Sequence, residues 1–112
     1  MFIAMNRFKI KPGSEQDFID IWKNRDSYLK EVPGFKQFNL LQGESQEEYT
    51  LFSSHAVWES RDAFEAWTKS EAFRKAHANA GGRKDIYAGP PKLECFDSVL
   101  YWCFHRPGSL LV

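Results

Sequence analysis

The sequence has little cysteine, no long apolar run and no excess of charge, and each absence excludes a class of protein. Its only cysteines, Cys95 and Cys103, lie too far apart on an extended segment to bridge, so we expect free thiols in a reducing cytoplasm. No apolar run approaches the roughly 20 residues of a membrane span, and the first residues lack the basic start of a secretory leader. Fifteen basic residues balance fifteen acidic ones, so no field attracts nucleic acid.

Several familiar catalytic patterns are missing as well. His55, His77 and His105 have no partners at the spacings of a zinc site. The pair Gly81 and Gly82 follows a predicted helix instead of preceding one, so it is not a phosphate-binding loop. No Ser-His-acid set, Cys-His set or carboxylate pair can be assembled from sequence alone. Aromatic residues make up 16% of the chain, which suits a core or a pocket built from flat rings. The length of 112 residues is that of one domain.

The first apolar segment alternates as a strand does. Over residues 2–10, one face carries an amide, Asn6, among apolar residues. A buried amide without partners is costly, so Asn6 is either satisfied within the protein or directed at a ligand. Both interpretations stay open at this point.

A helical stripe follows the turn at Pro12 and Gly13. Ser14 resembles an N-cap, and apolar residues then recur at spacings of three and four until Pro33 and Gly34 end the pattern, namely Phe18, Trp22, Leu29 and Val32. Arg25 interrupts this stripe. It is either a side chain that snorkels at the rim or the partner of an anion at the mouth of a pocket.

The rest of the pattern predicts an α+β domain over residues 1–101. We expect strands at 35–41, 49–58 and 93–101, a polar loop at 42–48, and a second helix capped by Ser60. The order strand, helix, strand, strand, helix, strand is the ferredoxin-like arrangement, with an antiparallel sheet and both helices on one face. Residues 102–112 read as an irregular tail.

The second helix carries the residues of greatest interest. Phe64, Trp67, Phe73 and His77 follow one apolar stripe, Ser70 predicts a break into a second short helix, and the glycine pair at 81 and 82 ends it. On an unbroken helix Trp67 and His77 would lie about 15 Å apart along the axis, as on two walls of one flat cavity. Taken singly, either residue could simply belong to the core.

The sheet face away from the helices predicts an assembly. Ile3 and Met5 are directed to that face, and a soluble monomer seldom leaves a large apolar patch in water. A second copy of the same sheet would cover it, so we predict a two-fold homodimer.

Five short segments together resemble a known group of enzymes. They are Met5-Asn6-Arg7-Phe8, Pro33-Gly34-Phe35, Trp58-Glu59-Ser60, Ala63-Phe64-Glu65-Ala66-Trp67 and Ala76-His77. They are similar to the antibiotic biosynthesis monooxygenase superfamily, and more closely to its IsdG-type haem-degrading branch, over about residues 1 to 100. Asn6, Trp67 and His77 occupy the positions of that branch's Asn…Trp…His triad.

The resemblance implies a dimeric α+β barrel with one haem per subunit. His77 then resembles the iron ligand, as a single helical histidine can be. Asn6 resembles the amide that hydrogen-bonds the bound oxygen, and Trp67 the residue that forces the porphyrin out of plane. The full haem-binding set expected here is Asn6, Trp22, Arg25, Phe64, Trp67, Phe73 and His77.

The activity implied is the opening of haem with O₂ and external electrons, supplied by a reductase or a small reductant, to give a linear tetrapyrrole and iron. Haem is both cofactor and substrate in this scheme. Two alternatives stay open: a cofactor-independent monooxygenase acting on a quinol or polyphenol, and a non-catalytic dimeric barrel that binds haem or another small molecule. No nucleic-acid or membrane partner is expected.

Overall fold

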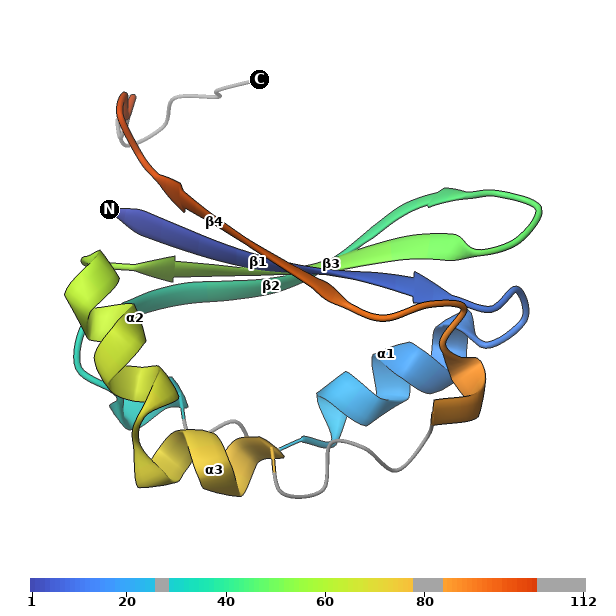
Figure 1. Cartoon of the computed structure of the whole chain (residues 1–112), viewed down its shortest axis with the longest axis horizontal. Helices are drawn as coiled ribbons and strands as arrows, with labels where there is room; N and C mark the ends of the chain where they lie inside the picture. Colours follow the sequence, from blue (N-terminus) through green and yellow to red (C-terminus); the bar gives the residue numbers. More distant parts are fainter. Residues whose placement is uncertain (26–28, 78–83, 103–112) are drawn as a thin grey trace, which may run out of the picture.

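A four-stranded antiparallel sheet forms one layer of the protein and the helices form the other (Figure 1). The computed structural model describes residues 1–25, 29–77 and 84–102. Its elements, including the single 3₁₀ turns η1 and η2, are β1 (Phe2–Ile10), α1 (Glu15–Lys23), η1 (Leu29–Glu31), β2 (Phe35–Ser45), β3 (Thr50–Trp58), α2 (Arg61–Thr68), α3 (Glu71–His77), η2 (Lys84–Ile86) and β4 (Lys92–Asp97). The strand order is β2-β3-β1-β4, and the expected ferredoxin-like fold is confirmed.

The first predicted helix is shorter than its stripe. It ends at Lys23, where the backbone N–H of Asn24 bonds to Asp20, and a separate turn, η1, follows at Leu29–Glu31. The prediction of one helix reaching Val32 was therefore wrong, because Arg25 leaves the helix to make a tertiary contact. Ser14 occupies the N-cap position but makes no side-chain cap bond; Glu15 instead accepts the N–H of Gly13 at 2.8 Å.

The strands differ from their predicted bounds mainly at their ends. β2 extends to Ser45 and so takes up part of the expected loop, and β3 begins one residue late. β4 ends at Asp97 because its partner β1 begins at Phe2, opposite Asp97, and offers little more backbone to pair with. The glycine pair at 81 and 82, Cys103 and the tail beyond residue 102 lie outside the described residues.

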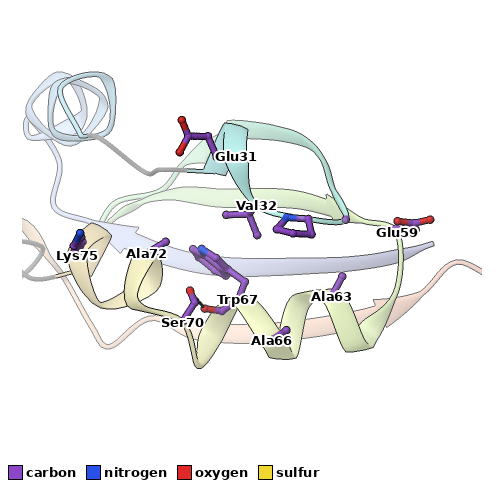
Figure 2. A pocket seen from close by; sticks show the side chains of 11 residues that line it. Glu31, Val32, Glu59, Ala63, Ala66, Trp67, Ser70, Ala72 and Lys75 are labelled. Atoms are coloured by element: carbon purple, nitrogen blue, oxygen red, sulfur yellow. Dashed lines mark hydrogen bonds between the residues drawn. The ribbon is translucent and has the colours of Figure 1, made fainter.

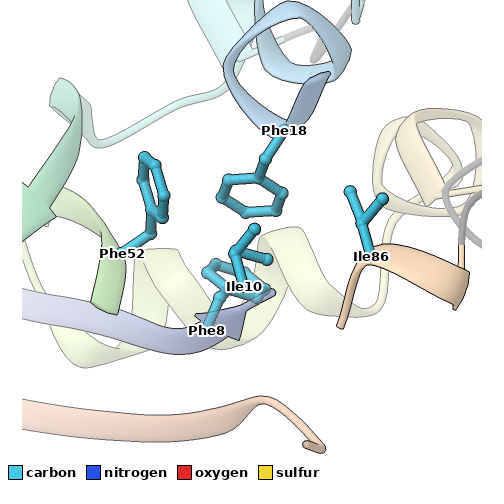
Figure 3. Packing of buried hydrophobic residues seen from close by; sticks show 5 residues of the cluster. All are labelled: Phe8, Ile10, Phe18, Phe52 and Ile86. Atoms are coloured by element: carbon cyan, nitrogen blue, oxygen red, sulfur yellow. The ribbon is translucent and has the colours of Figure 1, made fainter. Parts of the chain in front are cut away.

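Two apolar clusters join the layers and leave room between them. The first, beneath α1, consists of side chains that converge from β1, α1, β3 and η2 (Figure 3), namely Phe8, Ile10, Phe18, Phe52 and Ile86. The second lies beneath α2 and contains Phe2, Ala4, Leu29 and Trp58. The two clusters hold the helices at either end of the sheet, and the space between them becomes the site described below.

Gly34 allows the start of β2 to approach α2. Its φ is +82°, and a Cβ there would lie 2.5 Å from the Cβ of Ala63. Both facts require glycine. Within the described residues, no helix is long and apolar enough to span a membrane.

Candidate functional site

A cavity of about 320 Å³ lies between the sheet and the helices, at the junction of the two clusters. Its polar side chains are few and its wall is mostly aromatic or aliphatic, as in small-molecule sites generally. All seven residues expected to bind a ligand line it: Asn6, Trp22, Arg25, Phe64, Trp67, Phe73 and His77. Further lining residues, which the sequence did not single out, include Phe38, Ser54, Ala56, Trp58, Ala76 and Leu93.

Asn6 lies near the centre of the sheet. It pairs with Ser54 of β3 and with Leu93 of β4, and it shares the helix-covered face with Ala4 and Phe8. Among the residues that the structure describes, its half-buried amide has no hydrogen-bond partner. The interpretation of Asn6 as a satisfied core amide is therefore not what is observed.

The break between α2 and α3 creates the geometry of the helical wall. Ser70 Oγ accepts the N–H of Phe73 at 3.1 Å and donates to the carbonyl of Trp67 at 2.6 Å, so the expected N-cap and break are confirmed. The two helices then bend, and the ring centroids of Trp67 and His77 lie only 5.9 Å apart. The 15 Å separation expected for an unbroken helix does not apply, because the two rings are neighbours on the helical side of the cavity and Asn6 is on the sheet.

His77 is fixed by its own helix. Its ring stacks on Phe73 with centroids 4.0 Å apart, and Nδ1 lies 2.8 Å from the carbonyl oxygen of Phe73. Because a carbonyl only accepts, Nδ1 is the donor of this bond, and when the ring is neutral its lone pair lies on Nε2. An imidazole whose Nδ1–H is held by a backbone carbonyl is oriented as metal-ligating histidines are. The side chain is exposed, at the open side of the cavity.

Aromatic rings form the wall beyond His77. Trp67 lies between Trp58 and Phe73, at centroid distances of 5.4 and 4.8 Å. The indole nitrogens of Trp58 and Trp67 are buried, and no described group accepts their hydrogens. Buried N–H groups without acceptors are uncommon, and both of these residues line the cavity. The alternation of β3 puts Trp58 on the same face as Phe52 and Ser54, and this pattern could have identified Trp58 as a lining residue from the sequence.

Arg25 brings a cation to the cavity wall. Its guanidinium carbon lies 4.7 Å from the ring centre of Trp22, which stacks on Phe38 at 5.4 Å, and its Nε donates to the carbonyl of Ala76 at 3.1 Å. Burial lowers the pKa of Arg25 from its ordinary value, and burial raises the pKa of the nearby Tyr87 phenol above 10. No carboxylate in the described segments pairs with Arg25. Its side chain is thus half-buried instead of merely snorkelling at a rim.

Trp67 also borders a second hollow (Figure 2). This hollow is larger and more open than the cavity that contains Asn6 and His77. This hollow, of about 540 Å³, lies between α2, α3 and the segment around Val32 and Pro33. Its lining includes neither Asn6 nor His77, and its ionisable residues, Glu31, Glu59 and Lys75, are exposed. It therefore lacks the convergent polar groups that distinguish the smaller cavity.

The side chains of this cavity could hold a metal only if the bound ligand itself supplied most of the atoms that coordinate the metal. In the described part of the chain, no three His, Cys, Asp or Glu side chains gather as a metal site would require. One imidazole with a free Nε2, in an aromatic cavity, fits a metal held in a flat macrocycle. The cation of Arg25, which has no carboxylate partner among the described residues, would suit an anionic group of such a ligand.

Comparison with known protein families matches residues 1–79 to the antibiotic biosynthesis monooxygenase family. The chain belongs to that family. A heme-degrading monooxygenase of Bacillus thuringiensis (strain Al Hakam) is 31% identical over 97 residues, which are 87% of this chain and 89% of that protein. Both findings place this antibiotic biosynthesis monooxygenase among oxygen-using enzymes, as the sequence motifs indicated.

Solved structures of this monooxygenase fold include members with different chemistry. The heme-degrader MhuD from Mycobacterium tuberculosis, with two hemes bound in its active site, superposes with a TM-score of 0.68 at 27% identity, over 92% of this chain and 100% of that chain. SnoaB, a cofactor-independent oxygenase from Streptomyces nogalater, superposes with a TM-score of 0.65 at 19% identity, over 89% and 94%. At 19% identity the likeness shows the fold alone.

Proposed function

We propose that this family member is a haem-degrading monooxygenase. The observation that carries the proposal is His77: its Nδ1–H is held by Phe73, and its Nε2 has no partner among the described residues. His77 lines the same cavity as the Asn6 amide, which is likewise unpartnered in the described part of the chain. The sequence similarity to a heme-degrading monooxygenase and the structural similarity to MhuD support it. Haem would be substrate and cofactor together, consumed with O₂ and external electrons to give a linear tetrapyrrole and free iron.

Each side chain of the cavity has a defined part in this proposal. His77 would hold the iron of a bound haem through Nε2, and Trp67 would pack its ring against the macrocycle. Asn6 offers an amide N–H to the oxygen substrate, a fixed donor of the kind that stabilises developing charge. Arg25 pairs with a carboxylate of the ligand, which would restore a counter-ion to its partly desolvated cation. Trp22, Phe64 and Phe73 supply apolar contact.

The enclosed volume limits how such a ligand could lie. About 320 Å³ is near the lower end of the range of about 300–1,000 Å³ for small-molecule pockets. The lining residues His77 and Leu93 are exposed and mark the open side. A large ligand would therefore extend past them. We further propose a cytoplasmic homodimer that receives electrons from a reductase or a small reductant.

A second candidate function is the cofactor-independent oxidation of a quinol or polyphenol. The amide of Asn6 and the imidazole of His77 could hydrogen-bond a quinol or polyphenol without any metal, and the ring of Trp67 could stack on it. The same residues would then bind and orient that substrate for a cofactor-independent oxidation. SnoaB shows that this fold accommodates an oxygenase of that kind. A barrel that binds haem without degrading it is the third possibility.

Titration with ferric haem tests the proposal. We expect a saturable visible band at one haem per chain in the wild type and its loss in His77→Ala. His55→Ala is the matched control, because His55 lies on the sheet face away from the helices, opposite Met5. Wild-type protein with haem, a reductant and air should then yield an open-chain product, identified by absorption and mass spectra.

Other results of these experiments would contradict the proposal or favour a different function. No haem binding at micromolar concentration would remove the proposal and favour the quinol enzyme, which a quinol oxidation assay then checks. Haem that binds through His77 but survives reductant and air would favour storage or transfer. Equal binding by His77→Ala and the wild type would mean that this histidine is not the ligand.

A further inference from the structure

Arg25 makes a hydrogen bond that crosses 51 residues of sequence to the end of α3. Its Nε donates to the carbonyl oxygen of Ala76 at 3.1 Å. That carbonyl belongs to the peptide group that joins Ala76 to His77. The guanidinium therefore holds the peptide plane from which His77 begins.

The acceptor, the carbonyl oxygen of Ala76, lies in the last turn of α3 and has no hydrogen-bond partner within the helix. Carbonyls in the last turn of a helix have no intrahelical partner, and a cation near a C-terminus also interacts well with the helix dipole. Ala76 is the buried residue of α3, so this bond forms in a partly desolvated place. Hydrogen bonds from charged donors are the stronger kind, and low exposure increases their effect.

The short helix is thereby held at both ends. Ser70 caps its start through the N–H of Phe73, and Arg25 fixes its last peptide. The arginine is itself held, because its guanidinium lies over Trp22 and Trp22 stacks on Phe38 of the sheet. A chain of contacts thus runs from β2 to the backbone of His77.

We propose that Arg25 is a positioning residue for His77: its guanidinium, braced on Trp22, fixes the Ala76–His77 peptide so that the imidazole keeps the orientation in which Nδ1–H meets Phe73 and Nε2 is free. The inference concerns the ligand-free protein, and its value for catalysis rests on the proposed function. It adds a structural task to the carboxylate-binding part assigned to Arg25 above.

Nuclear magnetic resonance on the ligand-free protein tests the bond directly. In the wild type, exchange of the Arg25 Nε–H with water should be about tenfold or more slower than that of Arg74, an exposed arginine of α3 paired with Glu71. Equal exchange would overturn the proposal without any variant having to fold.

The Arg25→Met variant tests the consequence for His77. At a pH where the ring is neutral, ¹⁵N spectra should show mostly the Nδ1–H tautomer in the wild type and in the control Arg74→Met, and a smaller share in Arg25→Met. A purely structural role would lower the melting temperature of Arg25→Met and leave the tautomer share unchanged in the folded protein. That outcome would also overturn the proposal.

Porphyrins with and without iron separate positioning from carboxylate binding. Metal-free protoporphyrin carries the same carboxylates as haem but cannot use His77. Arg25→Met should weaken ferric haem by about threefold or more beyond its effect on the metal-free ring. Equal weakening of both would assign Arg25 to the carboxylates alone and overturn the positioning role. Failure of the wild type to bind haem would sink the proposed function, whereas the ligand-free spectra would still decide this inference.

Discussion

At the scale of single residues, three side chains that are far apart in sequence share one cavity. Asn6 comes from the sheet, and Trp67 and His77 come from two helices that meet at a break. Asn6 and His77 could be selected from the sequence because a polar side chain is unusual on an apolar face, and Trp67 was selected through its match to the family triad. Their separations could not be predicted, because they depend on how the helices bend and dock.

Substitution of Asn6 should affect haem turnover much more than haem binding. Asn6→Ala should keep ferric haem affinity within about twofold and lose about 100-fold or more in turnover, because a fixed donor acts mainly where charge develops. Haem titration and single-turnover absorbance measure the two effects. Asn39→Ala is the control, because Asn39 lies opposite His55 on the far face of the sheet. Turnover by Asn6→Ala at the wild-type rate would show that this amide has no part in the chemistry.

At the scale of elements, caps and side-chain bonds decide where each helix lies. Ser60 accepts the N–H of Ala63 at the start of α2, and Ser70 does the same for Phe73 at the start of α3. At the other end of the sheet, Thr50 Oγ1 donates to the carboxylate of Glu15 at 2.6 Å and so ties α1 to β3. The serine caps and the bond between Thr50 and Glu15 can each be removed by one substitution.

Removal of the Ser70 cap should affect the site as well as stability. Ser70→Ala should lower the free energy of unfolding by about 1 kcal/mol, because the cap of α3 is lost. It should also weaken ferric haem binding, since the cap fixes the bend that brings Trp67 and His77 together. Ser60→Ala is the matched control, with a similar stability loss in urea unfolding and unchanged haem binding. If the two variants bind haem equally, the bend does not depend on Ser70.

The bond between Thr50 and Glu15 should appear in the pH dependence of stability. The hydroxyl of Thr50, followed by the backbone N–H of Glu15, lowers the pKa of the Glu15 carboxyl below its usual 4.5. A lowered carboxyl pKa stabilises the folded state at pH values above the unfolded pKa. That contribution disappears as the pH falls through the folded pKa.

Thr50→Val should therefore weaken this part of the acid sensitivity. Urea unfolding at about pH 6 and about pH 3 measures it: the wild type should lose more stability between the two than Thr50→Val does. Glu15→Gln, which cannot ionise, should likewise lose less than the wild type. An identical loss in all three proteins would show that Glu15 titrates normally in the folded state.

At the scale of the whole molecule, the sheet face away from the helices bears on assembly. Phe96 of β4 pairs with Ile3, and Leu41 of β2 lies on the same face; Phe96 is 47% and Leu41 43% exposed in the single chain. The two residues are on the two edge strands of that face, and exposed apolar side chains on one sheet face are typical of an interface. The predicted homodimer would cover them with a second sheet.

A charge on this face should separate the two chains. Phe96→Lys should change the sedimenting species from a dimer to the 13.1 kDa single chain at micromolar concentration, because burial of an unpaired ammonium is costly. Gln16→Lys, which adds the same charge to α1, should leave the dimer intact. A wild type that sediments as a single chain would exclude the dimer.

The element order, the helix-covered face and the position of the break at Ser70 could all be predicted from the sequence. These follow from local patterns: alternation in strands, stripes in helices and a serine where a helix must restart. Such patterns record which face of an element is buried, and neighbouring residues suffice to show it. The residue types of the cavity wall were readable for the same reason.

How those elements meet depends on contacts between residues that are distant in the sequence. The stripe that continued past Lys23 predicted a longer helix, but Arg25 bonds to Ala76 instead, and periodicity carries no information about an acceptor 51 residues away. The approach of Trp67 to His77 likewise depends on the angle between α2 and α3. Contacts between distant residues are set by how the layers pack together, so the cavity and its chemistry become visible only in three dimensions.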